Sequence, residues 1–163
     1  MYHKLFFIFI ILLLSPVATI CTTDGKKESG HFYTVTKVVD GDTFWVDDGS
    51  VKGLKIRLIG VDAPESRNTG RKEMAYYGKE ASVYLSWLIG GKKVRFEYDV
   101  DRFDQYDRTL AYVYLENGIF VNANLVKNGY AMVMTVPPNV KYADTFLKLA
   151  RKARNRKRGL WGE

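Results

Sequence analysis

The chain contains one cysteine, Cys21, and only two histidines among its 163 residues. An intrachain disulfide is therefore excluded, and the fold has to be held together by its hydrophobic core. The two histidines, His3 and His31, lie outside the acidic motifs described below. This shortage disfavours both a zinc site and histidine acid catalysis.

Long hydrophobic runs are also absent, apart from one at the N-terminus. Residues 5–14 are all apolar and follow the basic Lys4. A helix of that length is ~15 Å long, which is short for a hydrocarbon core of ~30 Å. We therefore predict a signal peptide over residues 1–20 and an exported protein, either periplasmic, extracellular or attached to the cell envelope. Extension of the apolar segment to Ile20 leaves an uncleaved anchor as an alternative.

Cys21 directly follows this segment, a position that resembles the lipid-attachment site of bacterial lipoproteins. Ile20, however, stands where that pattern has a small residue. A membrane tether through a lipid on Cys21 and an incidental cysteine are therefore both open. Residues 21–30 are polar and predict a flexible spacer, which is followed by one globular domain over residues 31–163.

Positive charge dominates the composition, with 25 lysines and arginines against 18 acidic residues and a net charge of +7. A basic surface favours polyanions or anionic membranes as partners. Hydrophobic residues make up 47% of the chain, which suffices for a single ordinary core. The basic residues are densest over residues 141–158, which we interpret as a solvated helix face that raises encounter rates with polyanions.

The distribution of apolar residues predicts the secondary structure. β-branched and aromatic residues indicate five strands, over residues 32–39, 43–47, 54–61, 94–98 and 110–115. Apolar residues at helical spacing indicate three helices, over residues 77–88, 121–128 and 142–153. Five strands are the number in an OB-fold, so the predicted fold class is α+β, with a five-stranded OB-fold β-barrel and three α-helices.

Two acidic motifs stand at the ends of predicted strands. Asp40-Gly41-Asp42 joins the first two strands and is by itself typical of a hairpin turn. Asp62 and Glu65 flank Pro64 at the end of the third strand, where a long loop over residues 62–76 begins. These carboxylates converge if the three strands are neighbours. Carboxylates can hold a hard cation, and a further one can position or deprotonate water.

Two arginines complete this set of charged residues. Arg57 lies among apolar residues of the third strand, where an unpaired guanidinium would be costly, so we predict a carboxylate or phosphate partner for it. Arg108 is less distinctive by position. Guanidiniums can neutralise the charge that builds up on a phosphoryl group, and oxygen ligands favour Ca²⁺, Mg²⁺ or Mn²⁺. The combination favours cleavage of a phosphodiester with a bound divalent cation.

From about Tyr33 to Trp161 the chain resembles the staphylococcal-nuclease-type thermonucleases, the micrococcal nuclease family. The segments that carry the resemblance are residues 39–43, 57–65, 77–81, 104–112, 121–126 and 160–161. The resemblance implies a Ca²⁺-dependent, sugar-nonspecific nuclease. Such an enzyme hydrolyses DNA and RNA, preferably single-stranded or unstructured, leaves 3′-phosphate ends and is a monomer.

The resemblance also implies a metal site and a base. The carboxylates of Asp42 and Asp62 and the backbone carbonyl of Ala63 would bind Ca²⁺, and Glu65 would orient or deprotonate the attacking water. The best-known family member has threonine at the position of Ala63. Because the expected ligand is a backbone carbonyl, this change leaves the metal site intact.

For the substrate, the resemblance makes Arg57 and Arg108 the clamps on the phosphoryl oxygens and Tyr106 a contact to a substrate phosphate. Two positions depart from the family pattern. Thr135 stands where a base-stacking tyrosine is expected, and Gln105 replaces a lysine next to the site. These departures affect substrate affinity and base preference rather than the cleavage residues.

Two other classes of protein stay open as alternatives. One is a noncatalytic OB-type module that binds nucleic acid or protein, and the other is a membrane-surface protein that uses its basic helix on anionic lipid. The joint presence of the acidic residues and the two arginines favours the nuclease, because neither alternative requires them.

Overall fold

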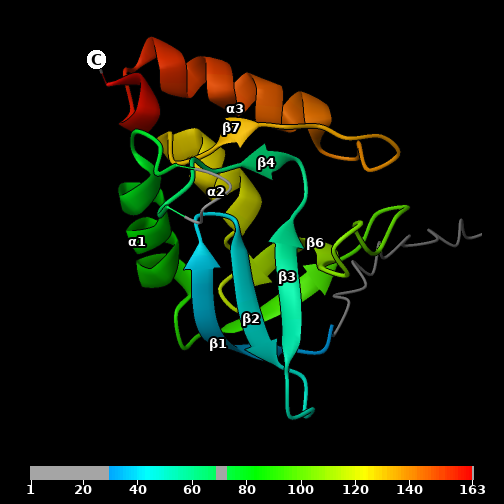
Figure 1. The fold of residues 1–163 in the computed structure, drawn as a ribbon. Helices are drawn as coiled ribbons and strands as arrows, with labels where there is room; N and C mark the ends of the chain where they lie inside the picture. Colours follow the sequence, from blue (N-terminus) through cyan, green and yellow to red (C-terminus); the bar gives the residue numbers. More distant parts are fainter. Residues whose placement is uncertain (1–29, 69–72, 163) are drawn as a thin grey trace, which may run out of the picture.

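The computed structural model describes residues 30–68 and 73–162 (Figure 1). The predicted signal peptide, the tether at Cys21 and nearly all of the polar spacer lie outside the described residues. Within the described ranges, no helix has the length and apolar character needed to cross a membrane.

Five strands close into a barrel in the order β1-β2-β3-β6-β5. Their bounds are Tyr33–Asp40 for β1, Thr43–Asp47 for β2, Leu54–Leu58 for β3, Lys93–Glu97 for β5 and Thr109–Leu115 for β6. Neighbouring strands are antiparallel except for β3 and β6, which run parallel. The barrel and its three helices confirm the predicted α+β OB-fold.

Alternation along the strands decides which side chains reach the outer face of the barrel. In β3, Ile56 and Leu58 are buried in the hydrophobic core. Successive side chains of a strand point to opposite faces, so Lys55 and Arg57 face outward. The predicted site residue Arg57 therefore belongs to the outer face formed by β1, β2 and β3, rather than to the barrel interior.

Three helices cover the barrel. Helix α1 (Gly78–Ile89) contacts β1, helix α2 (Val121–Asn128) contacts β6, and helix α3 (Ala143–Asn155) contacts α2. Figure 1 shows α3 lying across one end of the molecule, beside β7. A three-residue 3₁₀ helix, Gly159–Trp161, follows α3. Helix α1 ends at Gly90 and α2 ends at Gly129, and Gly129 has the left-handed φ of +75° that is common after a helix.

The strand predicted over residues 54–61 is wrong in its second half. β3 ends at Leu58, and Gly60 has a φ of +77°, a conformation that glycine adopts without strain. A Cβ atom at Gly60 would lie 2.5 Å from the ring of Phe146, so α3 packs closely on this turn. The chain then forms β4 (Val61–Asp62), which pairs with β7 (Met132–Val133) as a separate two-stranded sheet.

Asn122 holds this turn in place from within the core. Its side chain is fully buried, and its amide Nδ2 donates to the carbonyl of Ile59 at 2.9 Å. Its Oδ1 accepts the N–H of Val113, also at 2.9 Å. Because a buried amide without partners is costly, the register between α2, β6 and the turn before Asp62 is closely specified.

Candidate functional site

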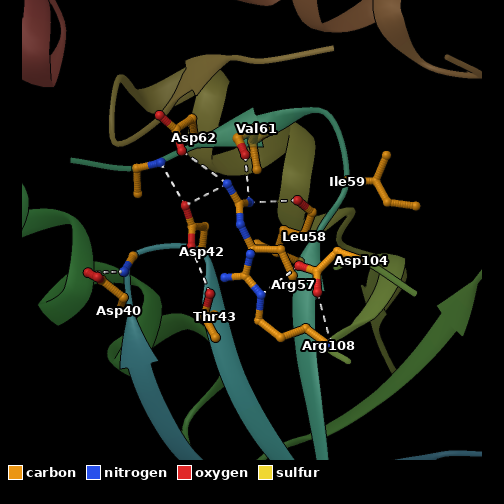
Figure 2. A network of polar contacts seen from close by, with 12 residues as sticks. Asp40, Asp42, Thr43, Arg57, Leu58, Ile59, Val61, Asp62, Asp104 and Arg108 are labelled. Atoms are coloured by element: carbon orange, nitrogen blue, oxygen red, sulfur yellow. Dashed lines mark hydrogen bonds and ion pairs between the residues drawn. The ribbon is translucent and has the colours of Figure 1, made fainter. Parts of the chain in front are cut away.

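A polar cleft of about 390 Å³ lies beside the β1–β2 turn and the segment after β4. Six of the seven site residues predicted from the sequence line it: Asp42, Arg57, Asp62, Ala63, Glu65 and Arg108. The seventh, Tyr106, lines an adjoining pocket of about 260 Å³ that shares Arg57 and Arg108 with the cleft. The structure therefore brings the acidic motifs together with both arginines (Figure 2).

Asp42 is the most deeply buried acidic residue in the described part of the chain, with a side chain that is 9% exposed. Its Oδ2 accepts the backbone N–H of Ala63 at 2.9 Å, and its Oδ1 accepts the hydroxyl of Thr43 at 2.9 Å. The neighbouring Gly41 permits this approach, since a Cβ there would lie 2.6 Å from the Cβ of Ala63. The turn between β1 and β2 is thus locked against the segment that carries Asp62 and Glu65.

Arg57 is buried and ion-paired, which confirms the partner predicted for it. Its Nη2 lies 3.2 Å from Oδ2 of Asp42 and 3.0 Å from Oδ1 of Asp62. Its Nη1 donates to the carbonyls of Leu58 and Val61 at 2.8 and 2.7 Å. These carbonyls belong to the turn around Gly60, so the break in the strand both positions Asp62 and orients the guanidinium (Figure 2).

Arg108 is positioned by Asp104, a residue to which no role was assigned from the sequence. The Nε of Arg108 donates to Oδ2 of Asp104 at 2.7 Å, and Oδ1 of Asp104 accepts the N–H groups of Tyr106 and Arg108. Burial raises the pKa of Asp104, but these hydrogen bonds and the charge of Arg108 outweigh it and leave the pKa below its usual value. An Asp that accepts the N–H two residues later is a recognised turn signal, which could have identified Asp104.

Tyr106 is 67% exposed, and the guanidinium carbon of Arg108 lies 5.3 Å from the centre of its ring. Gln105 lines the same pocket, whose lining also includes the apolar side chains of Met134 and Val136. Thr135 is not among the described residues that line this pocket or the cleft. Its neighbours Met134 and Val136 do line the pocket, and the effect of Thr135 on base preference stays a prediction.

Among the described residues, four carboxylates and three cationic side chains line the cleft, and the carboxylates at its β1–β2 turn act on one another. The pKa of Asp40 is raised, chiefly by burial and further by the nearby charges of Asp42 and Glu65. Hydrogen bonds from the N–H of Gly41 and the hydroxyl of Ser66 act in the opposite direction without cancelling this effect. A cation in the cleft would relieve the repulsion between these carboxylates.

The donor atoms around the cleft fit a hard cation. The residues that line it supply carboxylate and backbone oxygens, and the described ones include neither histidine nor cysteine. No group of three or more His, Cys, Asp or Glu side chains is assembled as a metal cluster in the described part of the chain. The expected set of two carboxylates and one backbone carbonyl does not require such a cluster. Oxygen donors of this mixed kind, completed by waters, suit Ca²⁺.

A closed mixed β-barrel with a cleft of carboxylates and guanidiniums on its outer face defines an OB-fold protein with a charged site beside strands β1 to β3. The family described as staphylococcal nuclease homologue matches residues 55–163, which is more than half of the chain. The chain belongs to the staphylococcal nuclease family.

Several relatives are similar over most of the chain. A thermonuclease of Staphylococcus hyicus is 41% identical over 130 residues, which cover 79% of this chain and 75% of the relative. A thermonuclease of Staphylococcus intermedius is 38% identical over 141 residues, covering 86% and 80% respectively. Endonuclease YhcR of Bacillus subtilis is 35% identical over 136 residues, which cover 79% of this chain but 11% of that longer protein.

Proposed function

We propose that this protein is a Ca²⁺-dependent nuclease that hydrolyses phosphodiester bonds in both DNA and RNA and leaves 3′-phosphate ends. The observation that carries the proposal is the meeting of Asp42, Asp62 and Glu65 with Arg57 and Arg108 around one cleft. The relatives named thermonuclease and endonuclease support nuclease activity in this family.

In the proposed reaction, a water molecule attacks phosphorus, and the bond to the 5′ oxygen breaks. The 5′ oxygen takes a proton from solvent and leaves as a hydroxyl, while the phosphate stays on the 3′ side. Glu65 orients this water or accepts its proton. Asp42, Asp62 and the carbonyl of Ala63 would hold Ca²⁺, which supplies positive charge beside the phosphoryl oxygens when bound. Arg57 and Arg108 neutralise the charge that develops on these oxygens.

Preorganisation is the main contribution of the fold to this mechanism. Arg57 is fixed by the carbonyls of Leu58 and Val61, and Arg108 is fixed by Asp104. Donors that are already oriented need little reorganisation as charge develops, and loss of one such donor typically costs about 10²–10³ in rate. The two arginines are thus suited to stabilise the transition state.

Single-stranded or unstructured nucleic acid fits the surroundings of the cleft best. The exposed ring of Tyr106 can contact a substrate phosphate or a base beside the apolar wall of the adjoining pocket. Stacking on aromatic rings tolerates any base, which favours low sequence selectivity. The net charge of +7 would raise the encounter rate with such polyanions at low salt.

We further propose that the protein acts as an exported monomer whose folded domain begins near residue 31. Export rests on the apolar segment over residues 5–14, and attachment to a membrane rests on Cys21. Mass spectrometry of the mature N-terminus separates the outcomes. A chain that begins with a lipidated Cys21 is tethered, a chain cleaved without lipid is released, and an intact N-terminus contradicts processing.

The nuclease proposal is tested by incubating the purified protein with single-stranded DNA, duplex DNA and RNA, each with Ca²⁺, with Mg²⁺ or with a chelator. We expect Ca²⁺-dependent cleavage of all three, with the single strand cut fastest. The product ends are identified by labelling before and after phosphatase treatment. Binding without cleavage under every condition would instead establish the noncatalytic module.

A further inference from the structure

A row of three side chains crosses the outer face of the barrel next to the cleft. Lys37 of β1 is paired with Trp45 of β2, and Trp45 is paired with Lys55 of β3. Cross-strand partners on one face lie close together, so the row presents an aromatic ring between two lysines. We refer to these three residues as the tryptophan row.

Trp45 faces outward although it is the largest side chain of β2. Phe44 and Val46, on either side of it, are fully buried in the core. Trp45 is itself half-buried, and the Nζ of Lys55 lies over its ring, 5.7 Å from the ring centroid. Lys37 is exposed. The barrel core is filled without this tryptophan, so core packing does not explain its presence.

The tryptophan row is continuous with the cleft. Thr43 and Arg57 are cross-strand partners, and both line the cleft. Thr43 lies two residues before Trp45 on β2, and Arg57 lies two residues after Lys55 on β3. Lys55 belongs to both, since it also lines the cleft. Two residues along a strand span roughly 7 Å, so the row lies one step along the sheet from the arginine proposed to hold the scissile phosphate.

We propose that Lys37, Trp45 and Lys55 form a subsite for single-stranded nucleic acid that extends from the cleft. Trp45 stacks on a base beyond the scissile bond, and the two lysines contact the flanking phosphates. A positively charged track interleaved with an aromatic ring is the combination that binds single strands irrespective of sequence. This subsite rests on the proposed function of the cleft.

Asp47 limits the subsite on the side of the row that faces away from the cleft. Asp47 follows Trp45 by two residues on the same strand face, and its carboxylate accepts the N–H of Gly49 in the β2–β3 turn. A negative charge there repels a phosphate backbone. The bound nucleic acid therefore runs between the row and the cleft and does not continue across the β2–β3 turn.

The test measures binding of a fluorescently labelled oligothymidylate of about eight nucleotides by anisotropy. A chelator is present so that the oligonucleotide is bound but not cleaved. We expect Trp45→Ala to weaken binding by roughly tenfold or more. The variant Trp45→Leu keeps an apolar side chain but removes the ring, and should weaken binding similarly; thermal unfolding checks that each variant is folded. The double variant Lys37→Gln and Lys55→Gln should lower the slope of log K against log salt by roughly 0.7 per lysine.

Trp87 of α1 provides a matched control because it is 70% exposed and carries a lysine, Lys92, over its ring. Trp87→Ala should bind the octanucleotide as the unchanged protein does. Trp45 variants that bind the octanucleotide as tightly as the unchanged protein would overturn the subsite, even if the protein cleaves DNA. An equal loss of affinity for a dinucleotide would also overturn it, because a dinucleotide is too short to occupy both the cleft and the row. Binding to vesicles containing phosphatidylglycerol is measured in parallel by sedimentation. If the Trp45 variants lose affinity for these vesicles but not for the octanucleotide, the subsite is overturned in favour of a lipid surface. The expected binding losses in a protein that cuts no substrate would sustain the subsite and refute the nuclease proposal.

Discussion

The carboxylate of Asp104 holds Arg108 in two ways, with one oxygen 2.7 Å from Nε of its side chain and the other accepting its backbone N–H. A single acidic side chain therefore fixes both the backbone and the guanidinium of a proposed phosphate clamp. The conformation is demanding, because Asp107 within the same turn has a φ of +57°. Asp104 is a positioning residue in this arrangement, since it acts through Arg108.

Replacing Asp104 with alanine should lower kcat by about 10- to 100-fold, because the guanidinium would lose its fixed orientation. Steady-state kinetics on single-stranded DNA measure the effect, and thermal unfolding shows whether the fold is retained. Asp144→Asn is the control, since Asp144 is an exposed acidic residue at the start of α3. An Asp104→Ala variant with full activity would show that Arg108 needs no such support.

Replacing Arg57 with glutamine should reduce both activity and stability. The rate should fall by about 10²–10³, because one preorganised donor is lost. Stability should fall by about 3 kcal/mol without added metal, because Asp42 would keep its buried charge without its cationic partner. Calorimetry and kinetics measure the two effects.

Calcium separates the two consequences of the Arg57→Gln change. A dication beside Asp42 and Asp62 replaces the missing charge, so Ca²⁺ should raise the unfolding temperature of the variant more than that of the unchanged protein. Activity should not return. Arg102→Gln, at an arginine stacked over Tyr98, serves as the control and should change neither quantity substantially. Equal Ca²⁺ effects on both proteins would contradict a metal beside Asp42.

The Glu65→Gln variant tests the proposed base. It keeps the shape of the side chain but cannot accept a proton, so kcat should fall by about 10²–10⁴. Substrate binding in the absence of turnover should change much less, because Glu65 acts on the water and not on the nucleic acid. Glu116→Gln, at an exposed position after β6, is the control. Normal turnover in Glu65→Gln would assign the base role to another group.

Much of the site could be predicted because a buried charge in a strand demands a partner. Alternation in the third strand placed Arg57 among apolar neighbours, which already required a carboxylate or phosphate, and the structure supplies Asp42 and Asp62. Strand number followed from β-branched and aromatic runs in the same way. Both predictions rest on local pattern, which the sequence expresses directly.

Features that depend on tertiary contact could not be predicted in this way. Residues 54–61 have the composition of one strand, and only the close packing of Phe146 against Gly60 explains why the chain turns there. Asn122 lies in a segment that carries the family resemblance, but its structural role was not predicted, because its bonds to Val113 and Ile59 connect distant segments. The pairing of β4 with β7 depends on that turn and was missed for the same reason.

Away from the cleft, Glu97 joins β5 to the segment before α3. Its carboxylate pairs with the ammonium of Lys141 at 2.7 Å and accepts hydrogen bonds from the hydroxyls of Tyr114 and Tyr142. Burial raises the pKa of Glu97, but these partners and the charge of Lys141 outweigh it, so the pKa lies below its usual value of 4.5. The ionised form is therefore favoured in the folded state.

This network predicts how stability depends on pH. A carboxyl whose pKa is lower in the folded than in the unfolded protein stabilises the fold above the unfolded value of 4.5, and this contribution is lost as the pH falls through the folded value. At pH 7, Glu97→Gln should therefore reduce the free energy of unfolding by about 1–2 kcal/mol. The difference from the unchanged protein should shrink as the pH is lowered below about 4.5. Urea titrations between pH 3 and 7 measure it, and a difference that stays constant with pH would show that the charge of Glu97 contributes nothing to stability.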